Sequence, residues 1–143
     1  MAISQAVANS FKKEILEGIH DLESGGDVFK LGLYTSVATL SSATTSYTTS
    51  NEVAASGQYV AGGGVLTNQQ VSLATGGVAI ADFNDLSFTG VTLTARGALI
   101  YNSTEAKKAV CVLDFGADKT ATSGTFTIQF PNFTSSSAIL RIA

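Results

Sequence analysis

Few side chains in this sequence could carry out chemistry, and the first to consider is a single imidazole. His20 is the only histidine among 143 residues, so one chain cannot assemble a metal site from several histidines. It falls near the end of a helical pattern described below, where the helix dipole mildly favours an imidazolium. We therefore predict a structural role for His20.

Acidic residues gather in two short segments, and neither has the spacing of a chemical site. Asp82, Asn84 and Asp85 lack the glycine and the terminal glutamate of a calcium-binding loop, so we interpret them as a turn that hydrogen-bonds its own backbone. Asp114 and Asp118 could form a carboxylate pair, but nothing else in the sequence builds a cleft around them. We predict no catalytic residue, no metal site and no cofactor.

Cysteine and charge usage narrow the classes of function. Cys111 is the only cysteine and lies in an apolar strand pattern, so we expect it in the core. Charged residues make up 13% of the chain, against about 25% in a typical soluble domain. The net charge of −3 leaves no basic stripe for nucleic acid. No apolar run approaches the ~18 residues of a membrane span, so we predict a soluble protein made in a cytoplasm.

The elements that must position these side chains begin with a helix. Apolar residues recur at helical spacing from about residue 4 to 22, which predicts one amphipathic helix with Ser4 as N-cap and Gly25-Gly26 at its end. Such a helix is marginal alone in water, so it must dock, either on its own sheet, which we favour, or on a neighbouring subunit. The predicted docking and oligomer-packing residues are Val7, Phe11, Ile15, Ile19 and Leu22.

From Asp27 onward, apolar and polar residues alternate with a period of two, which predicts strands. Short turns separate the runs, which favours an antiparallel β-sandwich or a jelly-roll-like barrel over βαβ units. We therefore predict one mainly β domain over residues 1–143, with the N-terminal amphipathic α-helix at about 4–22 and the β-sandwich at about 27–143. The predicted strands span residues 28–34, 78–83, 86–102, 108–115, 124–130 and 138–143.

The longest of these runs, at 86–102, is expected to bend or bulge at Gly90 or Gly97, because it exceeds an ordinary strand. Two arginines lie on predicted strands. Arg96 has the parity opposite to that of its apolar neighbours and points away from the face they line, and Arg141 in the last strand is placed comparably. Exposure to water is the default for both, with an ion pair at a subunit interface as the alternative.

The segment between Leu31 and Ala81 contains one charged residue, Glu52. It is too long for a structureless loop, so we expect short strands near 58–60 and 65–73. Uncharged strand edges invite pairing with another chain, which suggests a surface that a second protein covers. A hydroxyl-rich arm hydrated by water is the equally open alternative.

Three blocks, at residues 2–36, 94–120 and 126–143, resemble a family of small virion structural proteins of tailed bacteriophages. The likeness extends over essentially the whole chain. It implies a capsid cement or decoration protein on the exterior of the virion head, present in many copies and made in the host bacterial cytoplasm. The implied partners are further copies of the chain, with a trimer favoured, and the major capsid protein, whose subunits it would bridge.

Other functions remain open at this stage. The chain could instead be a component of the tail or of the head-tail junction, or a module that binds host-surface glycan or protein. Against a glycan platform, tryptophan is absent, and the tyrosines are spread along the sequence at Tyr34, Tyr47, Tyr59 and Tyr101. An enzyme is the least favoured class, because no pattern of catalytic residues is present.

Overall fold

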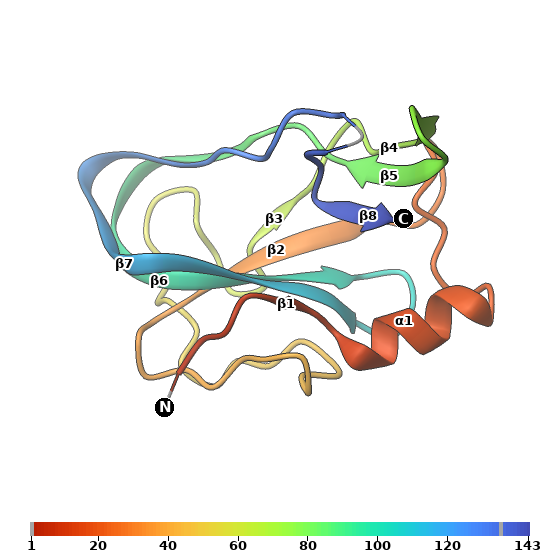
Figure 1. Ribbon diagram of the computed structural model, residues 1–143. Coiled ribbons are helices and arrows are strands. Elements are labelled where there is room, and N and C mark those ends of the chain that lie inside the picture. Colours follow the sequence, from red (N-terminus) through yellow and green to blue (C-terminus); the bar gives the residue numbers. More distant parts are fainter. Residues whose placement is uncertain (1, 135) are drawn as a thin grey trace.

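The computed structural model describes residues 2–134 and 136–143, which form two antiparallel sheets and one short helix (Figure 1). Strands hold 49% of the residues and helix 6%, so the predicted mainly β, sandwich-like class is confirmed. The larger sheet has the order β1-β7-β6-β2-β3 and the smaller sheet β4-β5-β8. The elements are β1 (Ala6–Val7), α1 (Asn9–Leu16), β2 (Phe29–Tyr34), β3 (Gly64–Val65), β4 (Gln70–Ala74), β5 (Val78–Asp82), β6 (Leu86–Asn102), β7 (Lys108–Ile128) and β8 (Leu140–Ile142).

One long ribbon, made of β6 and β7, connects the two layers. Its pairing shifts register between Phe88 and Val91 and between Ala95 and Gly97, so the predicted irregularity near Gly90 and Gly97 is confirmed. Gly90 has a φ of 64°, a left-handed conformation that glycine adopts without a Cβ clash. Figure 1 shows the ribbon curving at the left edge of the molecule, from the larger sheet toward the smaller one.

The prediction of two separate strands at 108–115 and 124–130 is wrong, because β7 runs through both. The residues between them keep pairing with β6, with Thr120 opposite Thr94 and their hydroxyls 2.9 Å apart. Gly116, whose φ of 80° is typical of a turn, instead lies where the register of the ribbon slips. Glycine is common both in turns and at β-bulges, so the sequence alone does not distinguish a strand that ends at Gly116 from one that continues past it.

The charge-poor middle segment, between Leu31 and Ala81, holds less regular structure than expected. The single strand expected near 65–73 is instead two short strands, β3 at its start and β4 at its end, with residues 66–69 outside both. The strand expected near 58–60 is absent; residues there form a single bridge between Ser56 and Tyr59 around Gly57, whose φ is 52°. A turn this tight leaves no length for a strand.

The helix begins later than predicted. Val7 belongs to β1, where it pairs with Cys111, because the backbone of β1 continues the larger sheet beyond β7. The N-cap is Ala8, without a side-chain cap, whereas Ser4 donates its backbone N–H to the carbonyl of Leu40 at 2.9 Å. The segment 4–7, which the helical periodicity assigned to the first turn of the helix, is therefore held by backbone pairing with other segments instead.

The helix also ends earlier than predicted. Its C-cap is Glu17, and Gly18 follows with a φ of 73°, so Gly25-Gly26 do not terminate it. Ile19 and Leu22 therefore lie in the loop after α1. A left-handed glycine is a common helix terminator, and here it stops the helix after two turns.

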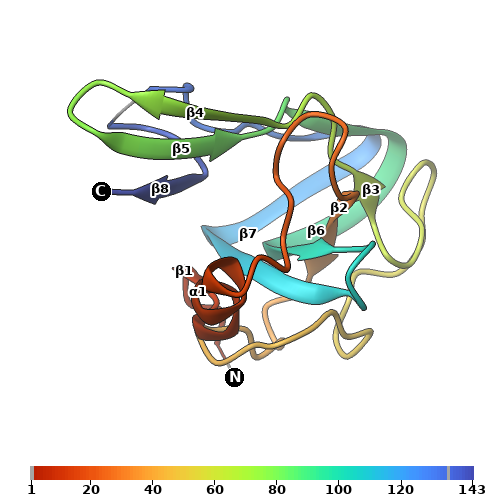
Figure 2. The ribbon, with the colours of Figure 1, turned by 90° about the vertical axis from the view of Figure 1, so that its right-hand side faces the viewer.

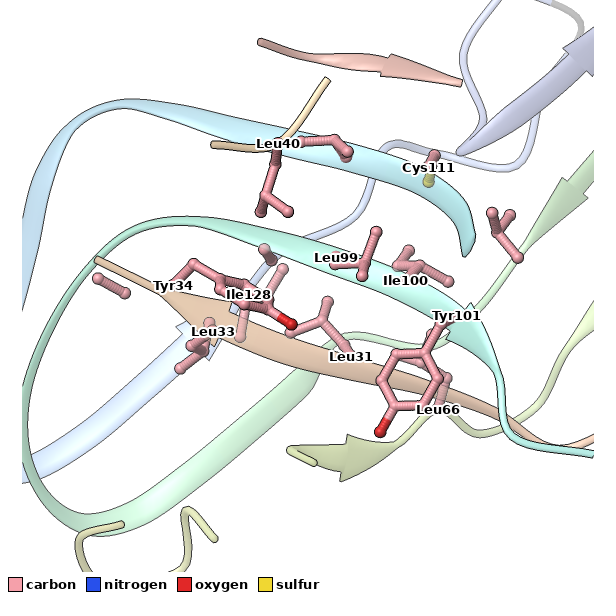
Figure 3. Packing of buried hydrophobic residues seen from close by; sticks show 14 of the residues in the cluster. Leu31, Leu33, Tyr34, Leu40, Leu66, Leu99, Ile100, Tyr101, Cys111 and Ile128 are labelled. Atoms are coloured by element: carbon pink, nitrogen blue, oxygen red, sulfur yellow. The ribbon is translucent and has the colours of Figure 1, made fainter. Parts of the chain in front are cut away.

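The core is centred on β2, β6 and β7 of the larger sheet, whose side chains pack with loop residues such as Leu40 and Leu66 (Figure 3). Leu31 and Leu99 have no exposed surface, and Phe83, just after β5, packs on Phe29 of β2 with ring centroids 5.7 Å apart. Cys111 is a buried free cysteine, as expected, and its burial raises the pKa of its thiol to about 12.

Candidate interaction surface

A groove of about 720 Å³ lies between α1 with its following loop and the smaller sheet. In Figure 2, α1 lies below β4, β5 and β8 on the same side of the molecule. We call this hollow the α1 groove. Its apolar lining consists of Val7, Phe11, Ile15, Leu16 and Leu22 on the helix side and Val71, Ala79, Ile80, Ala81, Leu140 and Ile142 on the sheet side.

The pairing register of the smaller sheet explains why most of its side of the groove is apolar. Residues directly opposite in antiparallel strands share a face, as do residues two apart in one strand. One cross-strand row is therefore formed by Val71, Ala81 and Leu140, and the next by Leu73, Ala79 and Ile142. All six side chains lie on one face, and none is polar.

Part of this face is open to solvent. The exposed fraction is 75% for Leu73, 61% for Ile142 and 50% for Val71 on this face, and 89% for Leu16 on α1. Exposed apolar side chains are ordinary when scattered, but contiguous apolar patches mark interaction sites. We therefore treat the α1 groove with its exposed rim as the candidate interaction surface.

Four of the five predicted docking residues, Val7, Phe11, Ile15 and Leu22, line the groove, whereas Ile19 does not. Phe11 is 5% exposed and α1 contacts β7, so the helix packs on its own sheet, the favoured alternative. Packing of the same residues against a second subunit stays a prediction. The sequence reasoning missed the rim residues Leu16, Leu73 and Ile142, although the alternation in β4 was a usable signal.

The two arginines have different surroundings. Nε of Arg96 lies 3.4 Å from Oδ1 of Asp114 on the neighbouring strand, and the two side chains are 36% and 28% exposed. A partly exposed pair of this kind contributes little to stability. Arg141 lies in β8 opposite Ile80 and lines the α1 groove. A role for either arginine in ion pairing at a subunit interface stays a prediction.

His20 belongs to a chain of hydrogen-bonded polar side chains in which His20 and Asn102 are buried and Glu14 and Asp27 are half-buried. Its Nε2 lies 2.9 Å from Oε1 of Glu14, and its Nδ1 lies 3.0 Å from the amide nitrogen of Asn102, which also donates to Asp27 at 2.8 Å. Both imidazole nitrogens thus have partners, and the ring packs 4.7 Å from that of Phe11. This arrangement ties α1 and its loop to the end of β6.

In both acidic segments, aspartate carboxylates accept hydrogen bonds from backbone N–H groups. Oδ1 of Asp82 accepts the N–H of the next residue at 2.9 Å, as the turn interpretation predicts, and Asp85 accepts the N–H of Phe130 at 2.8 Å. Burial raises the pKa of the Asp82 carboxyl. Asp114 accepts the N–H of Gly116, whereas Asp118 is exposed.

The four tyrosines, far apart in sequence, gather around Glu52. Hydroxyls of Tyr47 and Tyr59 donate to its carboxylate at 2.5 and 2.6 Å, and the N–H of Gly62 donates at 2.8 Å. Tyr101 donates to the carbonyl of Gly62 at 2.6 Å and stacks on Tyr47. We call these residues the Glu52 cluster, with Tyr34 as its fourth tyrosine. The expectation of spread tyrosines is corrected, because the loops of the middle segment fold them together.

The Glu52 cluster offers no sugar platform, because three of its tyrosines are nearly inaccessible. Tyr34 and Tyr59 are 0% exposed and Tyr101 is 2% exposed. The cluster instead fastens the long middle segment, in which Glu52 is the single charged residue, to the larger sheet. Its hydroxyls point to carboxylate and backbone partners inside the domain.

Alkaline pH is expected to unfold the domain through these tyrosines. Burial, followed by the nearby Glu52 charge, raises the pKa of Tyr101 from 10.0 to about 12, and burial raises the pKa of Tyr34, Tyr47 and Tyr59 as well. Between pH 10 and 12 the unfolded chain therefore binds fewer protons than the folded one, so stability present below pH 10 is lost as pH rises.

Urea unfolding between pH 8 and pH 12, with tyrosinate absorbance recorded in parallel, measures this effect. The midpoint is expected to fall steadily above pH 10, with tyrosinate appearing together with unfolding. Four tyrosines that ionise near pH 10 in a folded protein would contradict the buried cluster.

Comparisons with known proteins place the chain in no family: a scan against family models, a search of curated proteins and a search of solved structures each found no match. Within residues 2–134 and 136–143, no helix is long and apolar enough to cross a membrane. The same residues contain no group of three or more histidine, cysteine or acidic side chains placed to hold a metal ion.

Proposed function

We propose that this chain is a structural protein of a tailed-phage virion, and specifically a capsid cement protein on the outside of the head. Many copies, assembled as trimers, would bridge neighbouring major capsid protein subunits. The resemblance of residues 2–36, 94–120 and 126–143 to small phage virion proteins supports the setting. The exposed apolar rim of the α1 groove is the observation that supports docking.

The apolar lining of the α1 groove is suited to attachment to a large protein shell. Removing apolar surface from water stabilises a contact by roughly 25 cal/mol per Å². The groove is also lined by the charged residues Lys12, Asp21, Glu23 and Arg141, which must stay in water or be paired when the shell protein binds. Leu16 and Ile142 lie on opposite sides of the hollow, so a segment of the shell protein that fills it would contact both. Repetition over many symmetric copies turns individually weak contacts into strong attachment.

Binding to emptied phage heads tests this proposal. The purified protein is expected to co-sediment with heads of the phage that encodes it. The double variant Leu16→Asp and Ile142→Asp is expected to bind at least about tenfold more weakly, because two apolar contacts are lost and each carboxylate must give up water on binding. Both wild-type residues are more than half exposed in the isolated chain, so the variant should keep its melting temperature.

Val37→Asp provides the matched control, since Val37 is 55% exposed and does not line the α1 groove. It should bind heads like the wild type. Failure of the wild-type protein to bind would contradict the cement function. If the double variant bound heads as tightly as the wild type, the α1 groove would not be the surface that attaches the protein to the head.

Copy number separates the two positions in the virion. A cement protein is present in many copies per particle, whereas a ring or sleeve component of the tail is present in few. Quantitative mass spectrometry of purified virions, with the major capsid protein as reference, measures this ratio.

A further inference from the structure

The outer edge of β4 is an uncharged and unpaired strand edge. β4 has β5 on one side and is the terminal strand of its sheet among the described residues. Its first four residues, Gln70 to Leu73, are exposed and Ala74 is half-buried. Natural edge strands are usually protected by lysine, proline, bulges or very short length. Residues 68–77 contain no charged residue and no proline, and β4 has five residues.

We propose that this edge pairs with β4 of a second copy of the chain, antiparallel about a two-fold axis through Ser72. The inference stands on the β4 edge and does not require the proposed virion function. The result is one continuous sheet of six strands in the order β8-β5-β4-β4-β5-β8.

The self-complementarity of β4 selects this partner and this register. Centring the axis on Ser72 is the arrangement that pairs all five residues, placing Gln70 opposite Ala74 of the second copy and Val71 opposite Leu73 of the second copy. Apolar side chains then meet apolar side chains twice, on one face, where cross-strand pairs stabilise a sheet. Around a two-fold axis, a charged residue lies close to the same residue of the second copy and is repelled by it. β4 has no charged residue, so no such repulsion opposes the pairing.

The pairing also continues the apolar face of the smaller sheet across the axis. In each copy this face carries the rows Val71, Ala81, Leu140 and Leu73, Ala79, Ile142. Val71 and Leu73, at 50% and 75% exposed, would lose part of their exposed surface. The contact differs from a three-fold assembly, so it would join two monomers or two trimers.

Sedimentation equilibrium of the full chain tests the pairing. The wild type is expected to double its mass with rising concentration, from one chain to two or from three to six. Leu73→Lys should raise the dissociation constant of this step at least about tenfold, because it removes two apolar pairs and brings two ammonium groups onto neighbouring diagonal positions. Leu16→Lys is the matched control, since Leu16 is exposed but lies on α1. It should leave the doubling unchanged.

Cysteine cross-linking tests the register. Cys111 is buried, so a new surface cysteine is the accessible thiol. Ser72→Cys should be joined efficiently by the shortest bismaleimide, whereas Gln70→Cys should not, because the two copies of residue 70 lie four residues apart along the pair, about 14 Å. No doubling of mass, doubling unaffected by Leu73→Lys, or equal cross-linking at both positions would overturn the proposal. If the wild-type protein doubled its mass but did not bind phage heads, the proposed virion function would be rejected and the β4 pairing would stand.

Discussion

Phe11→Asp is expected to destabilise the domain by at least about 5 kcal/mol, enough to unfold it or to release the N-terminal segment. Phe11 is the buried residue of α1, 5% exposed, and its ring contacts that of His20. Truncating a buried phenylalanine costs about 3–5 kcal/mol, and an unpaired buried carboxylate adds to this. The total is comparable to the whole stability of a typical domain.

Leu16→Asp is the matched control for this prediction. Leu16 lies on the same helix but is 89% exposed, so the aspartate stays in water and the melting temperature should change little. Thermal unfolding followed by circular dichroism compares the two variants. Equal melting temperatures for Phe11→Asp and wild type would show that α1 does not pack on its own sheet.

Glu52→Ala is expected to cost about 3 kcal/mol and to loosen the loops of the middle segment. The substitution removes the common acceptor of Tyr47, Tyr59 and the Gly62 N–H. Hydrogen bonds to a charged group contribute about 1.5–3 kcal/mol each, and buried donors left unpaired add a penalty. Glu52 and Tyr47 are only partly buried, so water can reach the donors that lose their acceptor. Hydrogen bonds to this water should offset part of the lost stability.

Urea unfolding of Glu52→Ala and Tyr47→Phe provides the measurement. Tyr47→Phe removes one of the three hydrogen bonds and keeps the ring stacked on Tyr101 at 4.7 Å, so about 1 kcal/mol is expected. Hydrogen exchange of backbone amides at 46–63 should rise in Glu52→Ala before global unfolding. Wild-type stability in Glu52→Ala would contradict the fastening role of this cluster.

The sequence was sufficient for the fold class because strand alternation is a local property. The period of two predicted β2, β5 and β6, and Gly90 and Gly97 marked the irregular places in β6. Pairing partners are not local, and this is where the predictions went wrong. The helical pattern at Val7 was overridden by pairing with β7. The glycine at Gly116 became a bulge because β6 continues opposite it.

The candidate site was predictable in part for the same reason. Phe11 and Ile15 were found because a helical stripe faces something apolar wherever it docks. The second wall, with Leu140 and Ile142, depends on β8 pairing with β5 some sixty residues earlier, which no local pattern encodes. Glu52 stood out in the sequence as an isolated charge, but only the fold brings the tyrosines to it.

A cryo-EM map of the intact virion tests the central claim most directly. We expect density for this chain on the outside of the head, in many copies, with the α1 groove turned toward the major capsid protein and Leu16 and Ile142 covered. Density confined to the tail, or a groove facing solvent in every copy, would contradict it.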